Sequence, residues 1–238
     1  MNDVQAVCTR FTAVALAIAV GLGLVSPGAA LPSARLALSA DALAPIADSA
    51  EQEIASGRIP GAVVLIGQEH EVVYRKAFGF RATRPHTVPM TIDTIFDLAS
   101  LTKVVATTTA VIQLIERRKV DLDAPASTYW PEFAAAGKEA ITIRDLLTHY
   151  SGLKPDLSLS RRWSGYRTAM NMLIAERPVY PTRTQYVYSD ENFEVLGEIV
   201  RRVSGMPLDR YCEENIFKPL RMGMAFLVRT DTRDLPER

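Results

Sequence analysis

The fold is decided by the stretch Thr94-Ile95-Phe96-Asp97-Leu98-Ala99-Ser100-Leu101-Thr102-Lys103, which continues as far as Lys119. From Leu101 onward, apolar or half-apolar residues recur at intervals of three and four, which is typical of a helix with one buried face. These residues are Leu101, Val104, Val105, Thr108, Val111, Ile112 and Ile115. We therefore predict a helix that begins near Ser100, with Asp97 and Ser100 as cap residues, and that ends at the basic run Arg117-Arg118-Lys119.

Ser100 and Lys103 are three residues apart, so on a helix their side chains lie one above the other. An amine one turn from a hydroxyl can activate it, and N–H groups at a helix start stabilise an oxyanion. Ser100 is therefore a candidate nucleophile. The alternative is that Ser100 only caps the helix and Lys103 is solvated. A second pair of this spacing, Ser151 and Lys154, lies in a stretch broken by glycine and proline, where no helical turn is enforced.

The composition is that of an ordinary folded protein. Of the 238 residues, 48% are hydrophobic and 23% are charged, which allows a sizeable core. The formal net charge is zero, so nothing indicates a nucleic-acid partner or an anionic membrane surface. The three histidines, His70, His86 and His149, are scattered without His-Glu-x-x-His or paired-cysteine spacing. We therefore expect no metal and no other cofactor.

Residues 1–30 read as a secretory signal peptide. Arg10 precedes an apolar run from Phe11 to Val25, and the small residues Gly28 and Ala30 favour cleavage after Ala30. The run is too short for an ordinary membrane-spanning helix. An acidic residue near the start weakens the positive leader, so an uncleaved anchor remains the alternative.

Removal of this segment would leave Cys212 as the single cysteine, which excludes an intramolecular disulfide in the mature chain. We expect no stable membrane span after cleavage and a periplasmic or secreted bacterial location. The oligomeric state stays undetermined.

Cap residues, glycines and the spacing of apolar residues predict the other main helices and strands. The predicted elements are a helix over 41–56, a hairpin of strands 61–67 and 72–79, a polar loop over 81–91, a short capped helix over 142–148 that Gly152 stops, an amphipathic piece over 168–175, and a helix that opens at 188–192 and ends at Ser204-Gly205.

Four ordered motifs carry a resemblance to a known family. The motifs are Phe96–Lys103, Val120–Pro125, Ile141–Leu153, and Tyr188-Ser189-Asp190 followed by Leu196-Gly197 and Ser204-Gly205. Over roughly 50–224, the chain resembles the serine β-lactamase and penicillin-binding-protein-like family, in its class C branch with related esterases and D-amino-peptidases. The resemblance implies an α/β (α+β) fold, with a mainly antiparallel sheet flanked by helices and a helical region over about 81–205, all within one domain spanning 31–238.

The resemblance also implies roles for three residues. Ser100 corresponds to the acylated nucleophile, Lys103 to its partner, and Tyr188 to the tyrosine that relays protons. The substrate would be a small acyl compound: an ester, a peptide or other amide, or a β-lactam. A phenol with an ordinary pKa near 10 can relay protons only if cations favour its anion or if the proton moves in concert. Lys103 is the evident cation.

The second motif departs from the usual Tyr-x-Asn. Asp190 stands where the amide is expected, so a donor toward Lys103 or the substrate is replaced by an acceptor. Asp190 could pair with Lys103 and keep it protonated, or contribute to substrate binding. An alternative register treats Ser189-Asp190-Glu191 as a Ser-Asp-Asn motif, which would move the hydroxyl role to Ser189.

A third element of the family, a Lys-Thr-Gly or His-x-Gly segment on a strand, does not occur in this sequence. We therefore expect a C-terminally truncated relative whose sheet is incomplete and has an exposed edge. Two alternatives to an active serine hydrolase follow. One is a non-catalytic relative that at most binds acyl ligands. The other is a Ser-His-Asp hydrolase using His149 with Ser151 or another serine, although no Gly-x-Ser-x-Gly elbow is present.

Overall fold

The structure is a computed structural model of the whole chain, and it describes residues 40–68, 70–158, 160 and 162–223. The predicted signal peptide over 1–30 lies outside the described residues. The chain divides after Ile92 into two compact units, which we describe separately. Within the described ranges, every helix falls short of the length and apolar character needed to span a bilayer.

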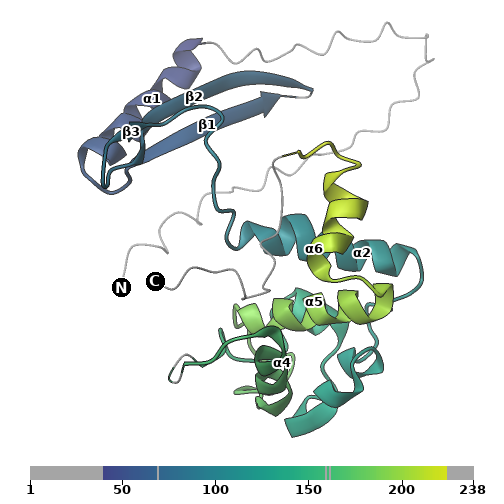
Figure 1. Cartoon of the computed structure of the whole chain (residues 1–238). Helices are drawn as coiled ribbons and strands as arrows, with labels where there is room; N and C mark the ends of the chain where they lie inside the picture. Colours follow the sequence, from purple (N-terminus) through teal and green to yellow (C-terminus); the bar gives the residue numbers. More distant parts are fainter. Residues whose placement is uncertain (1–39, 69, 159, 161, 224–238) are drawn as a thin grey trace, which may run out of the picture. The chain divides into compact units, whose positions relative to one another are not determined.

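The first unit holds a helix and a small antiparallel sheet. Its elements are α1 (Ala40–Ala55), β1 (Gly61–Gln68), β2 (Glu71–Ala82) and β3 (Val88–Pro89), and the strand order is β1-β2-β3 (Figure 1). The predicted helix and hairpin are confirmed. The prediction of a plain loop over 81–91 is wrong in part, because β2 extends to Ala82 and β3 pairs with it.

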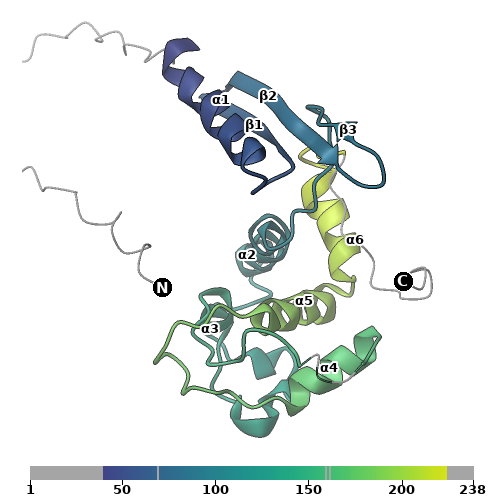
Figure 2. The same ribbon diagram turned by 90° about the vertical axis from the view of Figure 1, so that its left-hand side faces the viewer.

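Helix α1 packs on β1 and β2 in this unit (Figures 1 and 2). Phe78 and Leu43 are buried, whereas the apolar side chains of Leu65, Val72 and Phe80 are exposed. With only three strands in the described chain, the sheet is small and open. This is the incomplete α/β sheet expected from the sequence.

The second unit is helical. Its elements are η1 (Lys103–Thr108), α2 (Thr109–Glu116), η2 (Ala126–Thr128), η3 (Pro131–Gly137), α3 (Ile143–Leu147), α4 (Tyr166–Ala175), α5 (Asp190–Ser204), α6 (Leu208–Cys212) and η4 (Glu213–Phe217). The predicted helices at 142–148, 168–175 and 188–205 are confirmed as α3, α4 and α5. The sequence pattern did not predict α6 and η4.

Helix α5 lies in the middle of this unit, with α2, α3 and α6 packed around it (Figure 2). Its start is fixed by Ser189, whose hydroxyl accepts the Asn192 N–H, and its end by Gly205 in the left-handed conformation. One face carries Val195, Leu196, Ile199 and Val200, all fully buried. These side chains join Trp130, Phe133, Ile143, Leu146 and other buried residues in one core.

The predicted helix near Ser100 exists, but the prediction of its buried face is partly wrong. Residues 103–108 are π-helical, and a π turn takes up more residues than an α turn, which rotates the following side chains. Ala106, Ala110, Val111 and Leu114 are buried. By contrast, Leu101, Val104 and Ile112 are 59%, 64% and 46% exposed. The small alanines allow this helix to pack closely on α5.

Helix α3 begins with a capping box in which Thr142 and Asp145 bond to each other's backbone N–H groups. The prediction that Gly152 stops this helix is wrong. The helix ends at Leu147, and His149 then turns the chain with a φ of 62°. The segment 149–155 that follows faces the start of α5 through several hydrogen bonds.

Candidate active site

The chain turns sharply just before Ser100. Asp97 Oδ1 accepts the Ala99 N–H at 2.8 Å, and Ala99 takes a φ of 42°. The Lys103 N–H then donates to the Ser100 carbonyl at 3.1 Å, and its Nζ donates to Ser100 Oγ, also at 3.1 Å. Asp97 therefore fixes the turn, while the exposed Ser100 hydroxyl meets the amine as the three-residue spacing predicts.

Lys103 connects the start of this helix to the start of α5. Its Nζ lies 2.6 Å from Asp190 Oδ1 and 4.9 Å from the centre of the Tyr188 ring. Partial burial of the ammonium lowers the Lys103 pKa, but hydrogen bonds with Asp190 and Tyr188 outweigh it and raise the pKa above its ordinary 10.5. Lys103 is thus held as a cation.

Tyr188 also lies beside the Lys103 ammonium, although it is 85 residues further along the chain. Its side chain is 45% exposed. Hydrogen bonds with Lys103 and with Ser100 lower the Tyr188 pKa below its ordinary 10.0. The structure therefore brings together all four residues singled out from the sequence: Ser100, Lys103, Tyr188 and Asp190.

The alternative register at Ser189 is not favoured by the geometry. Ser189 is fully buried, and its hydroxyl donates to the Lys154 carbonyl and accepts the Asn192 N–H at 3.4 Å. These bonds make Ser189 the cap of α5. Tyr188, not Ser189, is the residue whose side chain meets Lys103.

The second Ser-x-x-Lys pair has structural contacts. Ser151 is buried, and its Oγ donates to Asn192 Oδ1 at 2.6 Å. Lys154 Nζ lies 2.5 Å from a Glu176 carboxylate oxygen. The Ser151 hydroxyl donates to Asn192 and His149 Nδ1 accepts the Ser189 N–H, so these two bonds engage Ser151 and His149 with other partners. The arrangement gives no support to a Ser-His-Asp hydrolase built on His149 and Ser151.

Two carboxylates beside the site were not singled out from the sequence. Glu191 is fully buried, and neither of its carboxylate oxygens has a hydrogen-bond partner in the described part of the chain. Burial, with Glu176 and Glu194 nearby, raises the pKa of Glu191 to about 8, and burial raises the pKa of Glu194 to about 7. The only sequence signal that could have drawn attention to these two glutamates is their position on one face of α5, close to Asp190.

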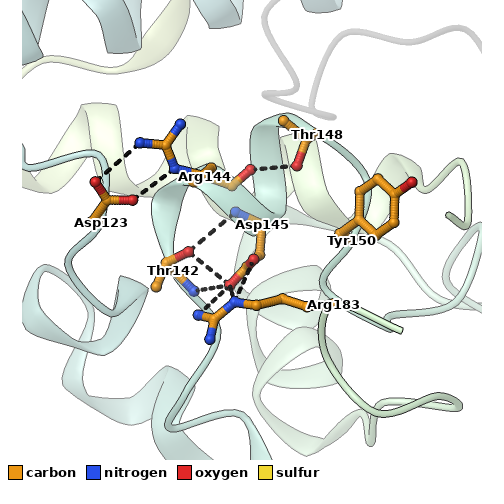
Figure 3. A pocket seen from close by; sticks show the side chains of 7 residues that line it. All are labelled: Asp123, Thr142, Arg144, Asp145, Thr148, Tyr150 and Arg183. Carbon is orange, nitrogen blue, oxygen red and sulfur yellow. Dashed lines mark hydrogen bonds and ion pairs between the residues drawn. The ribbon is translucent and has the colours of Figure 1, made fainter. Parts of the chain in front are cut away.

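The two best-formed cavities in the described chain lie away from these four residues. One, of about 450 Å³, is lined by Asp123, Thr142, Arg144, Asp145, Thr148, Tyr150 and Arg183 (Figure 3). Its two arginines are already bound by Asp123 and Asp145, as the dashed lines show. The other, of about 460 Å³, lies between α2 and α6. Neither Ser100 nor Tyr188 lines either of these two cavities.

No group of three or more His, Cys, Asp or Glu side chains that could hold a metal ion occurs among the described residues. The chemistry available at Ser100 is that of an alcohol, an ammonium, a phenol and a carboxylate. Such a set can form and hydrolyse an acyl ester by moving one proton.

Comparison with known proteins gives the same picture. The sequence profile described as Beta-lactamase matches residues 46–234. An N-acetylmuramyl-L-alanine amidase of Bacillus subtilis is 33% identical over 193 residues, which cover 72% of this chain and 43% of that protein. A protein of Escherichia coli K12 named "Putative D-alanyl-D-alanine carboxypeptidase" is 34% identical over 180 residues, covering 68% of this chain and 42% of the relative.

A solved structure from Caulobacter crescentus, described as a novel penicillin-binding protein homologue, is 30% identical with a TM-score of 0.64. The match covers 75% of this chain and 48% of that one. The chain thus spans about two fifths of the length of the curated relatives it matches. Since the profile match extends over far more than half of the sequence, and fold and relatives agree with it, the chain belongs to the serine β-lactamase and penicillin-binding-protein-like family.

Proposed function

We propose that this chain is a serine hydrolase that works through an acyl-enzyme on Ser100 and cleaves an ester, an amide or a β-lactam. The observation that carries the proposal is the 3.1 Å contact between Lys103 Nζ and Ser100 Oγ, with the centre of the Tyr188 ring 4.9 Å from the same ammonium. The names of the two curated relatives, an amidase and a carboxypeptidase, support amide hydrolysis in particular.

In this mechanism Lys103 remains protonated and does not act as the base. Asp190 supports this role because its carboxylate lies 2.6 Å from the ammonium and raises the Lys103 pKa. A permanent cation beside a phenol favours the phenolate. The base that accepts the Ser100 proton is therefore Tyr188, whose pKa is lowered by Lys103 and Ser100.

Each half of the reaction moves one proton through Tyr188. As the bond from Ser100 Oγ to the acyl carbon forms, the phenolic oxygen takes the hydroxyl proton. It then passes that proton to the leaving nitrogen or oxygen as the scissile bond breaks. In deacylation Tyr188 takes a proton from water as the water oxygen bonds to the acyl carbon, and it passes that proton to Ser100 Oγ as the bond between Oγ and the acyl carbon breaks. Backbone N–H groups at the start of the helix would stabilise the oxyanion.

We also propose that the chain is exported, to the periplasm or to the outside, through the leader over 1–30. The charged start, the short apolar run and the small residues before position 31 support this location. The name of one relative, an N-acetylmuramyl-L-alanine amidase of Bacillus subtilis, agrees with it. Mass spectrometry of the mature chain would test the leader, since cleavage after Ala30 predicts Leu31 as the first residue.

A second candidate function is non-catalytic binding of acyl ligands. It is favoured by the given sequence, in which no Lys-Thr-Gly or His-x-Gly element occurs. In this case Ser100 would react with an activated probe, but a natural acyl bond would not turn over.

Labelling with a fluorophosphonate, read by intact mass, tests the proposal. We expect one label on the wild-type chain, none on Ser100→Ala, and a rate about 10²- to 10⁴-fold lower in Lys103→Met. Lys154→Met and Ser158→Ala are the matched controls, because Lys154 belongs to the other Ser-x-x-Lys pair and Ser158 is exposed. Labelling that persists in Ser100→Ala would reject the assignment.

A hydrolysis screen then separates the two candidates. Nitrocefin, a short-chain nitrophenyl ester and a D-Ala-D-Ala peptide represent the three acyl classes. Turnover of any of them by wild type but not by Ser100→Ala supports the hydrolase. Labelling without turnover of all three supports the binding function.

A further inference from the structure

We propose that His149 is the positioning residue of this site: through its carbonyl and its imidazole it holds both neighbours of Tyr188 and so aims the phenol at Ser100 and Lys103. This inference rests on the proposed role of Tyr188. It concerns a residue outside the four that carry the chemistry.

His149 forms one hydrogen bond on each side of Tyr188. The Val187 N–H donates to the His149 carbonyl at 3.0 Å, and the Ser189 N–H donates to His149 Nδ1, also at 3.0 Å. The two bonds leave the backbone of Tyr188 little freedom. Because a displacement of about 1 Å can reduce a rate by 10²-fold, such control over the phenol has direct catalytic weight.

The imidazole also packs against the phenol itself. The ring centres of His149 and Tyr188 are 4.6 Å apart, and the centre of the Phe193 ring lies 5.3 Å from that of His149. Tyr186 meets the imidazole edge-on at 5.8 Å. His149 itself is buried, whereas Tyr186 and Tyr188 are 57% and 45% exposed, so the imidazole supports the two phenol rings from the interior of the unit.

The backbone of His149 indicates that the arrangement is built for this purpose. Its φ of 62° lies in the left-handed region, which costs a non-glycine residue roughly 1–2 kcal/mol. The left-handed turn lets the carbonyl and the side chain of one residue reach two N–H groups of the same neighbouring segment. Strained positions of this kind persist where surrounding contacts determine them.

The contact requires a neutral imidazole. Since Nδ1 accepts a hydrogen bond, the ring proton must be on Nε2. The charged and titratable groups that face the ring are Lys103, Asp190, Tyr186 and Tyr188. Burial and the Lys103 charge outweigh Asp190 and lower the His149 pKa below its ordinary 6.5. Protonation at acid pH would convert the acceptor into a donor and break the bond to Ser189.

His149→Asn and His149→Gly test the proposal as a matched pair. Both residues tolerate a positive φ. Asparagine places its Oδ1 at the branch position that Nδ1 occupies, so it keeps the acceptor, while glycine removes it. Both variants lose the ring contact, so the difference between them reports the acceptor at the Nδ1 position, which the Ser189 N–H reaches at 3.0 Å and the Asn192 amide nitrogen at 3.4 Å. Thermal melting confirms that each variant is folded.

The first readout does not need catalysis. In protein carrying [¹³Cζ]tyrosine, the Tyr188 resonance is identified with Tyr188→Phe and titrated by NMR. We expect the Tyr188 pKa to lie below 10.0 in wild type and in His149→Asn, and to move up toward 10.0 in His149→Gly, because the phenol moves away from Lys103. A folded His149→Gly variant with the wild-type Tyr188 pKa would overturn the proposal.

The second readout is fluorophosphonate labelling of Ser100. We expect His149→Asn to stay within about threefold of wild type and His149→Gly to be about 10- to 100-fold slower. Besides the fall caused by protonation of Tyr188, the wild-type rate should fall further as the pH drops through the His149 pKa, and His149→Asn should remove that second fall. Equal rates and pH profiles in the two variants would overturn the proposal. A wild-type chain whose labelling does not depend on Ser100 would reject the proposed function instead, and the NMR titration would still decide the role of His149.

Discussion

Lys103 Nζ lies 2.6 Å from Asp190 Oδ1, where the related motif has an amide. Replacing this carboxylate with the amide, in Asp190→Asn, should keep the shape of the site but remove the ion pair. The hydrogen bond with Asp190 is the main interaction that raises the Lys103 pKa, so the Lys103 pKa should fall in the variant.

The expected result is a change in pH dependence. The ammonium favours the Tyr188 anion, so Ser100 labelling should fall at the pH where Lys103 loses its proton. In Asp190→Asn that alkaline limb should move to lower pH, with labelling at pH 7 kept within about tenfold of wild type. Glu116→Gln, an exposed carboxylate at the end of α2, is the control and should leave the limb in place. An unchanged limb in Asp190→Asn would show that Asp190 does not hold the Lys103 proton.

Because Glu191 is buried, we expect the free energy of unfolding of the chain to fall as the pH rises. Burial raises its pKa to about 8, from 4.5 for an ordinary glutamate. Between these values the folded chain keeps a proton that the unfolded chain has lost, so the free energy of unfolding decreases with increasing pH. Glu191→Gln cannot ionise and should be more stable than wild type at pH 8, by on the order of 1–3 kcal/mol.

Urea unfolding at pH 5 and pH 8 measures this effect. The gain from Glu191→Gln should be large at pH 8 and small at pH 5, where Glu191 is protonated in the folded wild type. An equal gain at both pH values would mean that the carboxylate is not protonated by burial.

Local sequence patterns were enough to predict much of the fold. The spacing of Ser100 and Lys103 gave their contact, the capping signature at Thr142 gave α3, and the run from Tyr188 to Gly205 gave α5. Each of these depends on neighbours within one or two turns. The proximity of Tyr188 to Lys103 is a long-range contact, which the family resemblance supplied and periodicity alone could not.

The wrong predictions concern features that depend on tertiary packing. The burial of Ala106 in place of Leu101 follows from a π-helical stretch, and a pattern based on 3.6 residues per turn cannot foresee it. The role of His149 depends on a left-handed backbone and on segment 187–189, 38 to 40 residues away. Glu191 reads as a solvated helix residue until its surroundings are known.

The Asp145 carboxylate should stabilise the chain by closing the capping box of α3. It is buried, and it accepts the Thr142 N–H at 2.9 Å, the Thr142 hydroxyl at 2.7 Å and the Arg183 guanidinium at 2.9 Å (Figure 3). Asp145→Asn keeps the size of the side chain but replaces one acceptor with a donor. The expected loss is about 1–3 kcal/mol at pH 7.

This loss should depend on pH in a defined direction. Burial opposes the Asp145 charge, but the bonds from Arg183 and Thr142 outweigh it and lower the pKa below 3.8. The stabilisation is therefore present above pH 3.8 and is lost as the pH falls through the folded-state pKa. The melting temperature of Asp145→Asn should be lower than that of wild type at pH 7, and the difference between the two proteins should be smaller at pH 3. Asp123→Asn is the control, because the Asp123–Arg144 pair is exposed and should contribute little.

Gly152→Ala should disrupt the segment that holds Tyr188, for reasons of both conformation and space. Gly152 has a φ of 82°, and a Cβ at this position would lie 2.1 Å from the Tyr180 carbonyl oxygen. Gly205→Ala is the control, because Gly205 has a left-handed φ of 75° but nothing within 4 Å of the added Cβ. The control should lose only the backbone cost of about 1–2 kcal/mol, and Gly152→Ala more than about 3 kcal/mol. Since Gly152 lies three residues after His149, Ser100 labelling should slow in Gly152→Ala and stay near wild type in Gly205→Ala. Urea unfolding and fluorophosphonate labelling of both variants check this, and equal losses in the two would mean that the approach of Tyr180 to Gly152 is not required.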